Sequence, residues 1–177
     1  IGAGEGETSL DDLRTRHNAV FLGTGVYRSR SVDVPGADLN GVVDAIDFLT
    51  ASNRRGYDED PGEDVGLHAK GRRVVVIGGG DTAMDCVRTS IRQGAEKVTC
   101  VYRRDRANMP GSRQEVYNAE EEGANFEWLA APEEFLGEST VEGVKVLKMR
   151  LGVPDATGRR SIEGTGQHSI IEGDLVI

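Results

Sequence analysis

Cysteine is scarce in this 177-residue chain, which contains Cys86, Cys100 and no Cys-x-x-Cys pair. Two cysteines so placed exclude a disulfide scaffold, a redox dithiol and an all-cysteine iron–sulfur site within this segment. Long apolar runs are also lacking: no stretch approaches the roughly 20 residues of a membrane span, and the first residues do not resemble a signal peptide. We therefore expect a cytoplasmic protein with no membrane partner, in which both cysteines are buried apolar side chains.

Aromatic residues are few, at 5%, whereas 24 glycines and 37% hydrophobic residues indicate a globular α/β protein rich in turns. The net charge is −9, yet residues 70–113 hold ten basic and four acidic residues. A nucleic-acid-binding domain is usually basic over a whole face, so we expect no nucleic-acid partner. One basic stretch in an acidic chain instead indicates a single compact anion site.

The strongest pattern is a βαβ unit of about 30 residues. Residues 73–77 form an almost continuous β-branched run, typical of a buried parallel strand. Residues 81–93 carry apolar side chains at helical spacing and end at Gly94, and residues 97–102 predict a second strand. This unit predicts an α/β fold with a Rossmann-like parallel sheet flanked by helices.

The other elements are predicted from shorter patterns. A helix over 113–122, a strand over 125–129 and a C-terminal strand over 173–177 would complete the parallel sheet. Between residues 133 and 171, short strands separated by Gly and Asp predict a small antiparallel β-meander. Three elements are expected earlier in the chain: a helix over 10–16, a strand over 19–25 and a helix over about 41–53. We therefore divide the chain into an entry segment, residues 1–70, and a nucleotide-binding domain, residues 71–177.

A glycine-rich turn follows the first strand of the βαβ unit. Its residues, Gly78-Gly79-Gly80-Asp81-Thr82-Ala83, match the dinucleotide fingerprint G-x-G-x-x-A. Gly78 permits a tight turn, Gly80 lets a pyrophosphate approach the backbone, and Ala83 lets helix and strand pack closely. The free N–H groups near Gly80, Asp81 and Thr82 would face that dianion along the helix dipole. The alternative is a glycine-rich turn in a domain that binds no nucleotide.

Arginines follow the second strand, where a Rossmann domain contacts the adenine ribose of its cofactor. NAD-binding domains place Asp or Glu there, whereas this chain has Arg103-Arg104, with Arg106 close behind. Guanidinium groups suit a 2′-phosphate and offer no acceptor to the hydroxyl of NAD, so the pair predicts NADPH. After screening, we expect each arginine of the pair to contribute about 1–2 kcal/mol to NADPH binding. The alternative is a solvated basic loop.

Four segments resemble the small (beta) subunit of NADPH-dependent glutamate synthase. They are residues 19–27 (AVFLGTGVY), 78–86 (GGGDTAMDC), 102–112 (YRRDRANMPGS) and 118–123 (NAEEEG). The resemblance extends from about residue 9 to the end of the chain, and the same module is similar to the NADPH-binding part of dihydropyrimidine dehydrogenase. It implies the NADPH domain of a two-domain fold like that of flavin-dependent disulfide reductases.

In the family that the chain resembles, NADPH passes a hydride to FAD, and electrons continue through iron–sulfur clusters to a distant site. The resemblance implies that Gly23-Thr24-Gly25 is the crossover where the flavin and NADPH domains meet. It further implies that FAD and the clusters belong only to the full-length protein, whose FAD domain and large (alpha) subunit would be partners of this segment. The overall reaction would be glutamate formation from glutamine and 2-oxoglutarate, and we expect the isolated chain to be inactive and to contain no flavin.

Two other function classes remain open. A direct NADPH dehydrogenase would need its own acid or base, and the Tyr-x-x-x-Lys pair of short-chain dehydrogenases fails here because Glu121 stands four residues after Tyr117. A non-catalytic docking module would keep the nucleotide fingerprint without any chemistry. No catalytic residue and no metal ligand is predicted within the chain.

Overall fold

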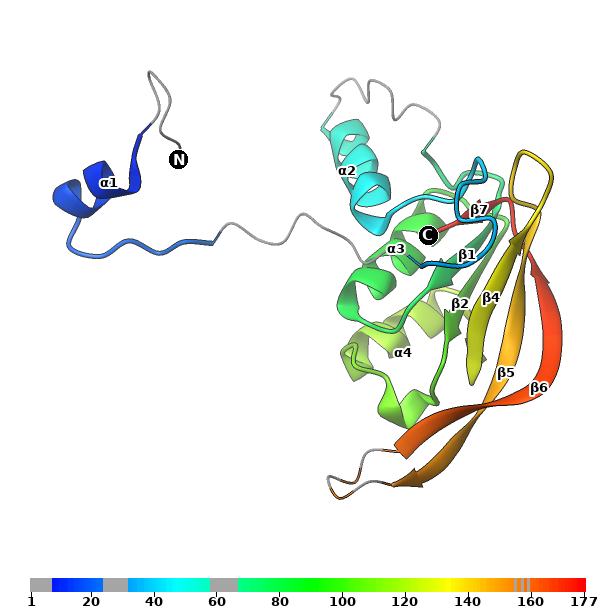
Figure 1. Cartoon of the computed structure of the whole chain (residues 1–177). Coiled ribbons are helices and arrows are strands. Elements are labelled where there is room, and N and C mark those ends of the chain that lie inside the picture. Colours follow the sequence, from blue (N-terminus) through cyan, green and yellow to red (C-terminus); the bar gives the residue numbers. More distant parts are fainter. Residues whose placement is uncertain (1–7, 24–31, 58–66, 155, 157, 159) are drawn as a thin grey trace.

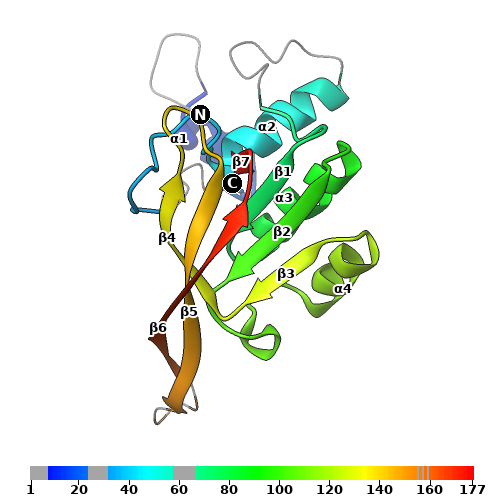
Figure 2. The same ribbon diagram turned by 90° about the vertical axis from the view of Figure 1, so that its right-hand side faces the viewer.

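The computed structural model describes residues 8–23, 32–57, 67–154, 156, 158 and 160–177. A four-stranded parallel sheet in the order β3-β2-β1-β7 lies at its centre. Helices α2, α3 and α4 cover one face of this sheet, and a three-stranded antiparallel sheet in the order β4-β5-β6 covers the other (Figures 1 and 2). The elements are α1 (Leu10–Arg16), α2 (Ala45–Gly56), β1 (Arg73–Ile77), α3 (Asp81–Arg92), β2 (Lys97–Tyr102), the 3-10 helix η2 (Arg106–Asn108), α4 (Arg113–Glu121), β3 (Asn125–Trp128), β4 (Ala130–Leu136), β5 (Gly143–Pro154), β6 (Arg160–Glu172) and β7 (Leu175–Val176). The predicted fold class is confirmed.

The central strand β1 is buried because both of its faces pack against other elements. Val74 and Val76 lie in one core with Met84 of α3, whereas Val75 lies in a second core with Val144 of β5. β1 pairs in parallel with β2 on one side and with β7 on the other. Successive residues of a strand point to opposite faces, so an unbroken run of valine can fill both cores.

The strand order places a crevice at the carboxyl end of β1. From β1 the chain moves outward through β2 to β3, and it returns to the opposite side of β1 as β7. Such a reversal of strand order is the position where open α/β sheets bind their ligands. The topology thus directs attention to the turn between β1 and α3.

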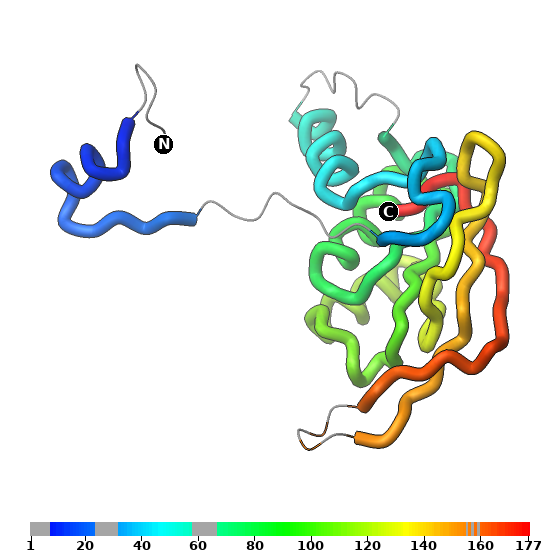
Figure 3. The backbone as a smooth tube through the Cα atoms, viewed as in Figure 1, coloured from blue at the N-terminus to red at the C-terminus, as the bar shows by residue number. Residues whose placement is uncertain are grey.

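The antiparallel sheet carries the chain back from β3 to β7, as the tube in Figure 3 shows in yellow, orange and red. Leu129 directly precedes this sheet, and its φ of 54° lies in the left-handed region that most side chains avoid. The Leu129 N–H donates to the Arg104 carbonyl, and the Leu129 carbonyl accepts from the Met149 N–H. The meander therefore starts slightly earlier than predicted, at Ala130, and the residue before it is tied to Arg104, two residues after the end of β2.

The helix expected over 41–53 begins later, at Ala45, and ends later, at Gly56. The residues before it are engaged elsewhere, because Asn40 forms a parallel bridge with Thr140 and Val42 forms one with Val176. Pairing with the sheets keeps this segment extended until Asp44, which precedes the helix. α2 then buries Phe48 in the same core as β1.

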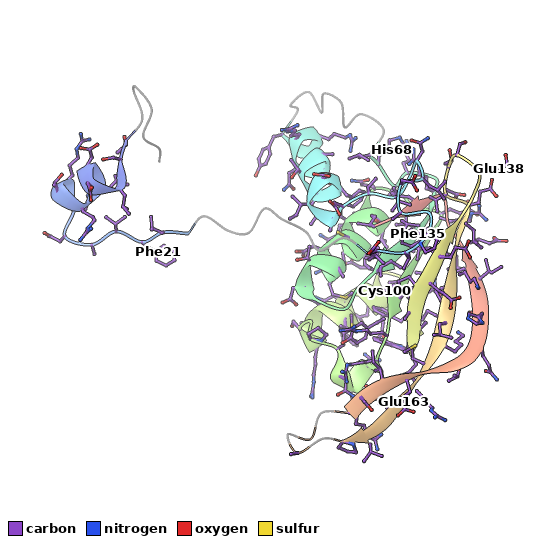
Figure 4. All side chains as sticks on the ribbon, viewed as in Figure 1. Phe21, His68, Cys100, Phe135, Glu138 and Glu163 are labelled. Atoms are coloured by element: carbon purple, nitrogen blue, oxygen red, sulfur yellow. The ribbon has the colours of Figure 1, made fainter. Side chains whose placement is uncertain are left out.

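The strand expected over 19–25 is wrong for the part that the structure describes, because residues 19–23 are not in a strand. A strand needs a hydrogen-bonding neighbour, and none is recorded for these residues among the described parts of the chain. Phe21 is 94% exposed, and Figure 4 shows it far from the sheets. Helix α1, in contrast, forms as predicted: the Ser9 side chain accepts from the Asp12 N–H, and the Asp12 carboxylate accepts from the Ser9 N–H.

Within the described residues, no helix is long and apolar enough to cross a membrane. The division of the chain at residue 70 stays a prediction.

Candidate nucleotide-binding site

The turn between β1 and α3 leaves no room for side chains at its centre. Gly78 has a φ of 142°, and a Cβ there would lie 3.4 Å from the Ala83 Cβ. A Cβ on buried Gly79 would lie 2.5 Å from Cδ2 of Tyr102, the last residue of β2. Gly79 is therefore required by the protein itself, because the Tyr102 ring covers it.

Gly80, in contrast, faces open space. A Cβ on Gly80 would meet no described atom within 4 Å, and its φ of −89° is one that any residue adopts. Gly80 immediately precedes α3, and no side chain caps that helix. The N–H groups of Asp81, Thr82 and Ala83 lack helical acceptors by their position, so they are free to bind an anion. The space beside Gly80 and the donors around it fit a pyrophosphate.

Asp81 has a partner within the chain, which the sequence did not reveal. Its Oδ1 accepts from the Ser112 N–H at 2.8 Å, and the Gly79 carbonyl accepts from the Gly111 N–H at 2.8 Å. A Cβ on Gly111 would lie 3.0 Å from the Gly79 oxygen, so only glycine fits closely at that position. The segment before α4 is thus hydrogen-bonded both to the glycine turn and to Asp81, and these two bonds hold the segment and the turn together.

The three arginines predicted after β2 lie in three different environments. Arg103 is exposed, and no hydrogen bond or ion pair is recorded for it with any described residue. Arg104 is only 8% exposed, and its Nη1 donates to the Arg160 carbonyl at 2.6 Å. Arg106 forms an ion pair with Glu120 of α4 at 2.6 Å. Of the three, Arg103 offers a guanidinium that no other described group uses.

A pocket of about 1020 Å³ adjoins the glycine turn at the carboxyl ends of β1 and β7. Its lining is mostly apolar, and the two acidic residues among the lining are Asp44 and Asp47 at the start of α2. The turn contributes Gly78, Gly80, Thr82 and Ala83. The fingerprint therefore borders the exposed Arg103 on one side and a large apolar pocket on the other. A dinucleotide has two chemically different ends, and each end needs surroundings of its own kind.

Both cysteines are buried, as predicted, and burial raises the pKa of each thiol to about 12. Cys86 lines the pocket, and the Cys100 thiol, labelled in Figure 4, donates to the Gly78 carbonyl at 3.2 Å. Thiols held protonated are poor metal ligands, since the thiolate is the binding form. No cluster of three or more His, Cys, Asp or Glu that could hold a metal ion occurs in the part of the chain that the structure describes.

The crossover predicted at Gly23-Thr24-Gly25 is described only at Gly23, which is exposed. Thr24 and Gly25 lie outside the described residues. The structure therefore does not bring Gly23 together with the turn at Gly78 and the arginines.

Fold and turn together define a dinucleotide-binding Rossmann domain. The model of the family described as pyridine nucleotide-disulphide oxidoreductase matches residues 4–176, so the chain belongs to that family. It is 59% identical, over 94% of its length, to the putative glutamate synthase [NADPH] small chain of Cereibacter sphaeroides. It is 52% identical, over 97% of its length, to the glutamate synthase [NADPH] small chain of Azospirillum brasilense. The resemblance stated from the sequence is confirmed.

The chain spans 39% and 36% of the lengths of these two relatives. Among solved structures, FprA from Mycobacterium tuberculosis in complex with NADPH matches with a TM-score of 0.74 and 21% identity, over 95% of this chain and 51% of that one. This likeness supports the fold. The chain is thus a domain of the pyridine nucleotide-disulphide oxidoreductase family with a Rossmann-type parallel sheet.

Proposed function

We propose that this chain binds NADPH and positions it for hydride transfer to FAD in a cytoplasmic electron-transfer oxidoreductase of the glutamate synthase type. The observation that carries the proposal is an uncapped helix start at Gly80 together with Arg103, which lies at the tip of the next strand and has no partner among the described residues. The first suits a pyrophosphate and the second suits a 2′-phosphate. A cofactor carrying both groups is NADPH.

The chain's own residues divide the work of binding. The N–H groups of Asp81, Thr82 and Ala83 hold the pyrophosphate, and Gly80 lets it come close. Arg103 holds the 2′-phosphate, for which charge-assisted hydrogen bonds give the preference over NADH. The apolar pocket along β1 and β7 receives the nicotinamide half and excludes water from it. Bound NADPH supplies a hydride.

FAD and the iron–sulfur clusters are assigned to other parts of a longer protein. Within the described residues, the one strand–glycine turn–helix unit is already assigned to NADPH, and neither buried cysteine suits a cluster. The two curated relatives are named as small chains of an NADPH-dependent glutamate synthase. We therefore propose an FAD domain of the same chain and a large glutamate synthase subunit as partners, and glutamine and 2-oxoglutarate as substrates of the assembly.

In the alternative, the chain is the NADPH-binding part of another flavin and iron–sulfur reductase, similar to dihydropyrimidine dehydrogenase, and the electrons reach a different final acceptor. The described residues around the glycine turn are proposed to bind NADPH and not the final electron acceptor. They would therefore serve either enzyme equally. With the remaining sequence of the Azospirillum relative joined to the chain and FAD added, NADPH supplied without oxygen should bleach the flavin absorbance. A flavin that stays oxidised would contradict hydride transfer and favour a non-catalytic docking module.

Nucleotide binding is tested by titrating the chain with NADPH and NADH while following the fluorescence of Trp128, the only tryptophan. Two equal contributions from the arginines would make the Arg103→Ala/Arg104→Ala variant bind NADPH more weakly than the wild type by about 30-fold or more. Because Arg104 is buried and bonded to the Arg160 carbonyl, we expect a loss of about 5–30-fold, the equivalent of about 1–2 kcal/mol. NADH affinity should stay the same because NADH lacks the 2′-phosphate. Equal losses for both nucleotides would mean that the pair serves the fold alone, and the cofactor assignment would fall.

A further inference from the structure

The two adjacent arginines after β2 have unlike surroundings, although the sequence suggests that they act alike. The chain bends at both residues once β2 has ended at Tyr102. Arg103 is exposed and has no recorded partner among the described residues, whereas Arg104 is 8% exposed. The bend thus sends one guanidinium into solvent and the other into the protein.

Arg104 is held by its side chain and by its backbone. Its Nη1 donates to the carbonyl of Arg160, the first residue of β6, at 2.6 Å. Its own carbonyl accepts from the N–H of Leu129, at the start of the antiparallel sheet, at 3.0 Å. Arg104 therefore joins the tip of β2 to two points of the meander: the junction just before β4 and the hairpin where β6 starts.

These contacts leave Arg104 unsuited to bind a cofactor. Because Arg104 as a whole is only 8% exposed, its side chain would have to leave the Arg160 carbonyl and its packing contacts before it could reach a phosphate. Breaking that bond would also leave a carbonyl without its donor. Arg103 needs no such rearrangement, because its side chain already extends into solvent at the strand tip.

We propose that Arg104 is a positioning residue that anchors the bend after β2 to the β5–β6 hairpin, so that Arg103 alone contacts the 2′-phosphate of NADPH. An anchored bend reduces the freedom that Arg103 would lose on binding, and this raises its affinity for the phosphate. The antiparallel sheet thereby contributes to cofactor selectivity without touching the nucleotide. The inference rests on the proposed function. The sequence assigned phosphate binding to both arginines, whereas here Arg103 binds the phosphate and Arg104 positions Arg103.

A double-mutant cycle separates contact from positioning. The variants are Arg103→Met, Arg104→Met and the pair of changes together, because methionine keeps much of the apolar stem and removes every donor. Each is titrated with NADPH and with NADH, and its thermal melting is recorded. We expect Arg103→Met to weaken NADPH binding about 5–30-fold with NADH unchanged. Arg104→Met should weaken it about 2–5-fold in the wild type, since it acts only through the ordering of its neighbour, and should have no further effect beside Arg103→Met.

Two further variants complete the design. Arg160→Ala should bind NADPH like the wild type, because the acceptor is the backbone carbonyl and the Arg160 side chain is exposed. Arg104→Lys keeps one charged donor and should restore most of the affinity lost in Arg104→Met. If Arg104→Met does not fold, Arg104→Lys takes its place in the cycle, with a smaller loss expected in the wild type and none beside Arg103→Met.

The outcomes distinguish this inference from the proposed function. An Arg104 change that costs the same factor with and without Arg103 would show an independent phosphate contact and overturn the inference alone. An unchanged NADPH affinity in Arg104→Met would overturn it too. A wild-type chain that binds neither nucleotide would overturn the proposed function and the inference together.

Discussion

Arg73 and Arg103 stand at opposite ends of the parallel sheet and show two uses of the same side chain. Arg73 begins β1, and its guanidinium forms a two-pronged ion pair with Asp174 at 3.0 and 2.5 Å and a further pair with Glu172 at 2.7 Å. Arg103 follows β2 and has no recorded partner among the described residues. Arg73 ties β1 to the residue before β7, whereas Arg103 is left for a ligand.

The difference extends to the backbone around each arginine. The Arg73 N–H also donates to Asp174 Oδ2 at 3.0 Å, so the charges and dipoles there are satisfied within the chain. At the carboxyl end, the first N–H groups of α3 lack a cap and the Gly80 Cα is open to solvent. Unsatisfied donors are costly when buried, but these face the open space beside Gly80, where the proposed pyrophosphate would bind.

The largest expected effect comes from filling the space at Gly80. The Gly80→Ala variant should bind both NADPH and NADH on the order of 10–100-fold more weakly, because overpacking of a close contact costs about 1–3 kcal/mol. Its thermal stability should stay that of the wild type, since no described atom lies within 4 Å of the added Cβ. Titration and thermal melting of the same sample measure the two effects.

Gly79→Ala is the matched control, one residue away. Its Cβ would approach the Tyr102 ring to 2.5 Å, so the free energy of unfolding should fall by about 1–3 kcal/mol. Chemical denaturation measures this change, and the variant Gly79→Ala/Tyr102→Ala should recover part of it. If Gly79→Ala and Gly80→Ala were equally stable, the distinction between a structural and a ligand-facing glycine would be lost.

A smaller effect is expected at the paired end of the sheet. Asp174→Asn should lower the free energy of unfolding by about 1 kcal/mol at pH 7, a modest value because both partners are about a third exposed to solvent. Arg73 lowers the pKa of Asp174, so the pair stabilises the fold above the unfolded pKa of about 3.9, and this contribution is lost as the pH falls through the lower folded pKa. The difference between variant and wild type should therefore vanish in strong acid.

Glu172→Gln is the control for the Asp174 change. Glu172 contacts the same guanidinium but is 76% exposed, so its loss should cost less than about 0.5 kcal/mol. Denaturation curves of both variants between pH 3 and pH 7 give the comparison. A pH-independent loss in Asp174→Asn would show that packing, and not the ion pair, holds β1 and β7 together at this point.

The smallest expected effect concerns Arg106, a third arginine that is paired although it stands near the cofactor side. Glu120→Gln would release it from its ion pair. Because exposed ion pairs contribute only about 0–1 kcal/mol, NADPH affinity should change by less than about threefold. An increase comparable to the loss in Arg103→Met would show that Glu120 normally withholds Arg106 from the phosphate.

Local patterns in the sequence predicted the βαβ unit well. β1 and β2 have the predicted bounds, and α3 ends one residue before the predicted end. A continuous β-branched run and a helical repeat are set by neighbouring residues, so they can be read along the chain. The segment 19–23 could not be predicted in this way, because a strand also needs a partner and the described residues supply none.

The candidate site was predictable in its parts but not in its contacts. The glycine fingerprint and the arginines were found from spacing. The bond from Arg104 to the Arg160 carbonyl joins residues 56 positions apart, and that from Ser112 to Asp81 joins residues 31 positions apart. The first bond depends on how the two sheets pack, and the second on how the segment before α4 lies over the glycine turn. No local pattern reveals either arrangement. The sequence therefore suggested two equivalent arginines, whereas in the part of the chain that the structure describes Arg103 has no partner and Arg104 is anchored.

The most direct test is a crystal structure of the chain with NADPH bound. We expect pyrophosphate oxygens within hydrogen-bond distance of the N–H groups after Gly80, and the 2′-phosphate on the Arg103 guanidinium. Arg104 should still donate to the Arg160 carbonyl. A 2′-phosphate held by Arg104, or a nucleotide bound away from the turn at Gly78–Ala83, would contradict both the site and the division of roles between the two arginines.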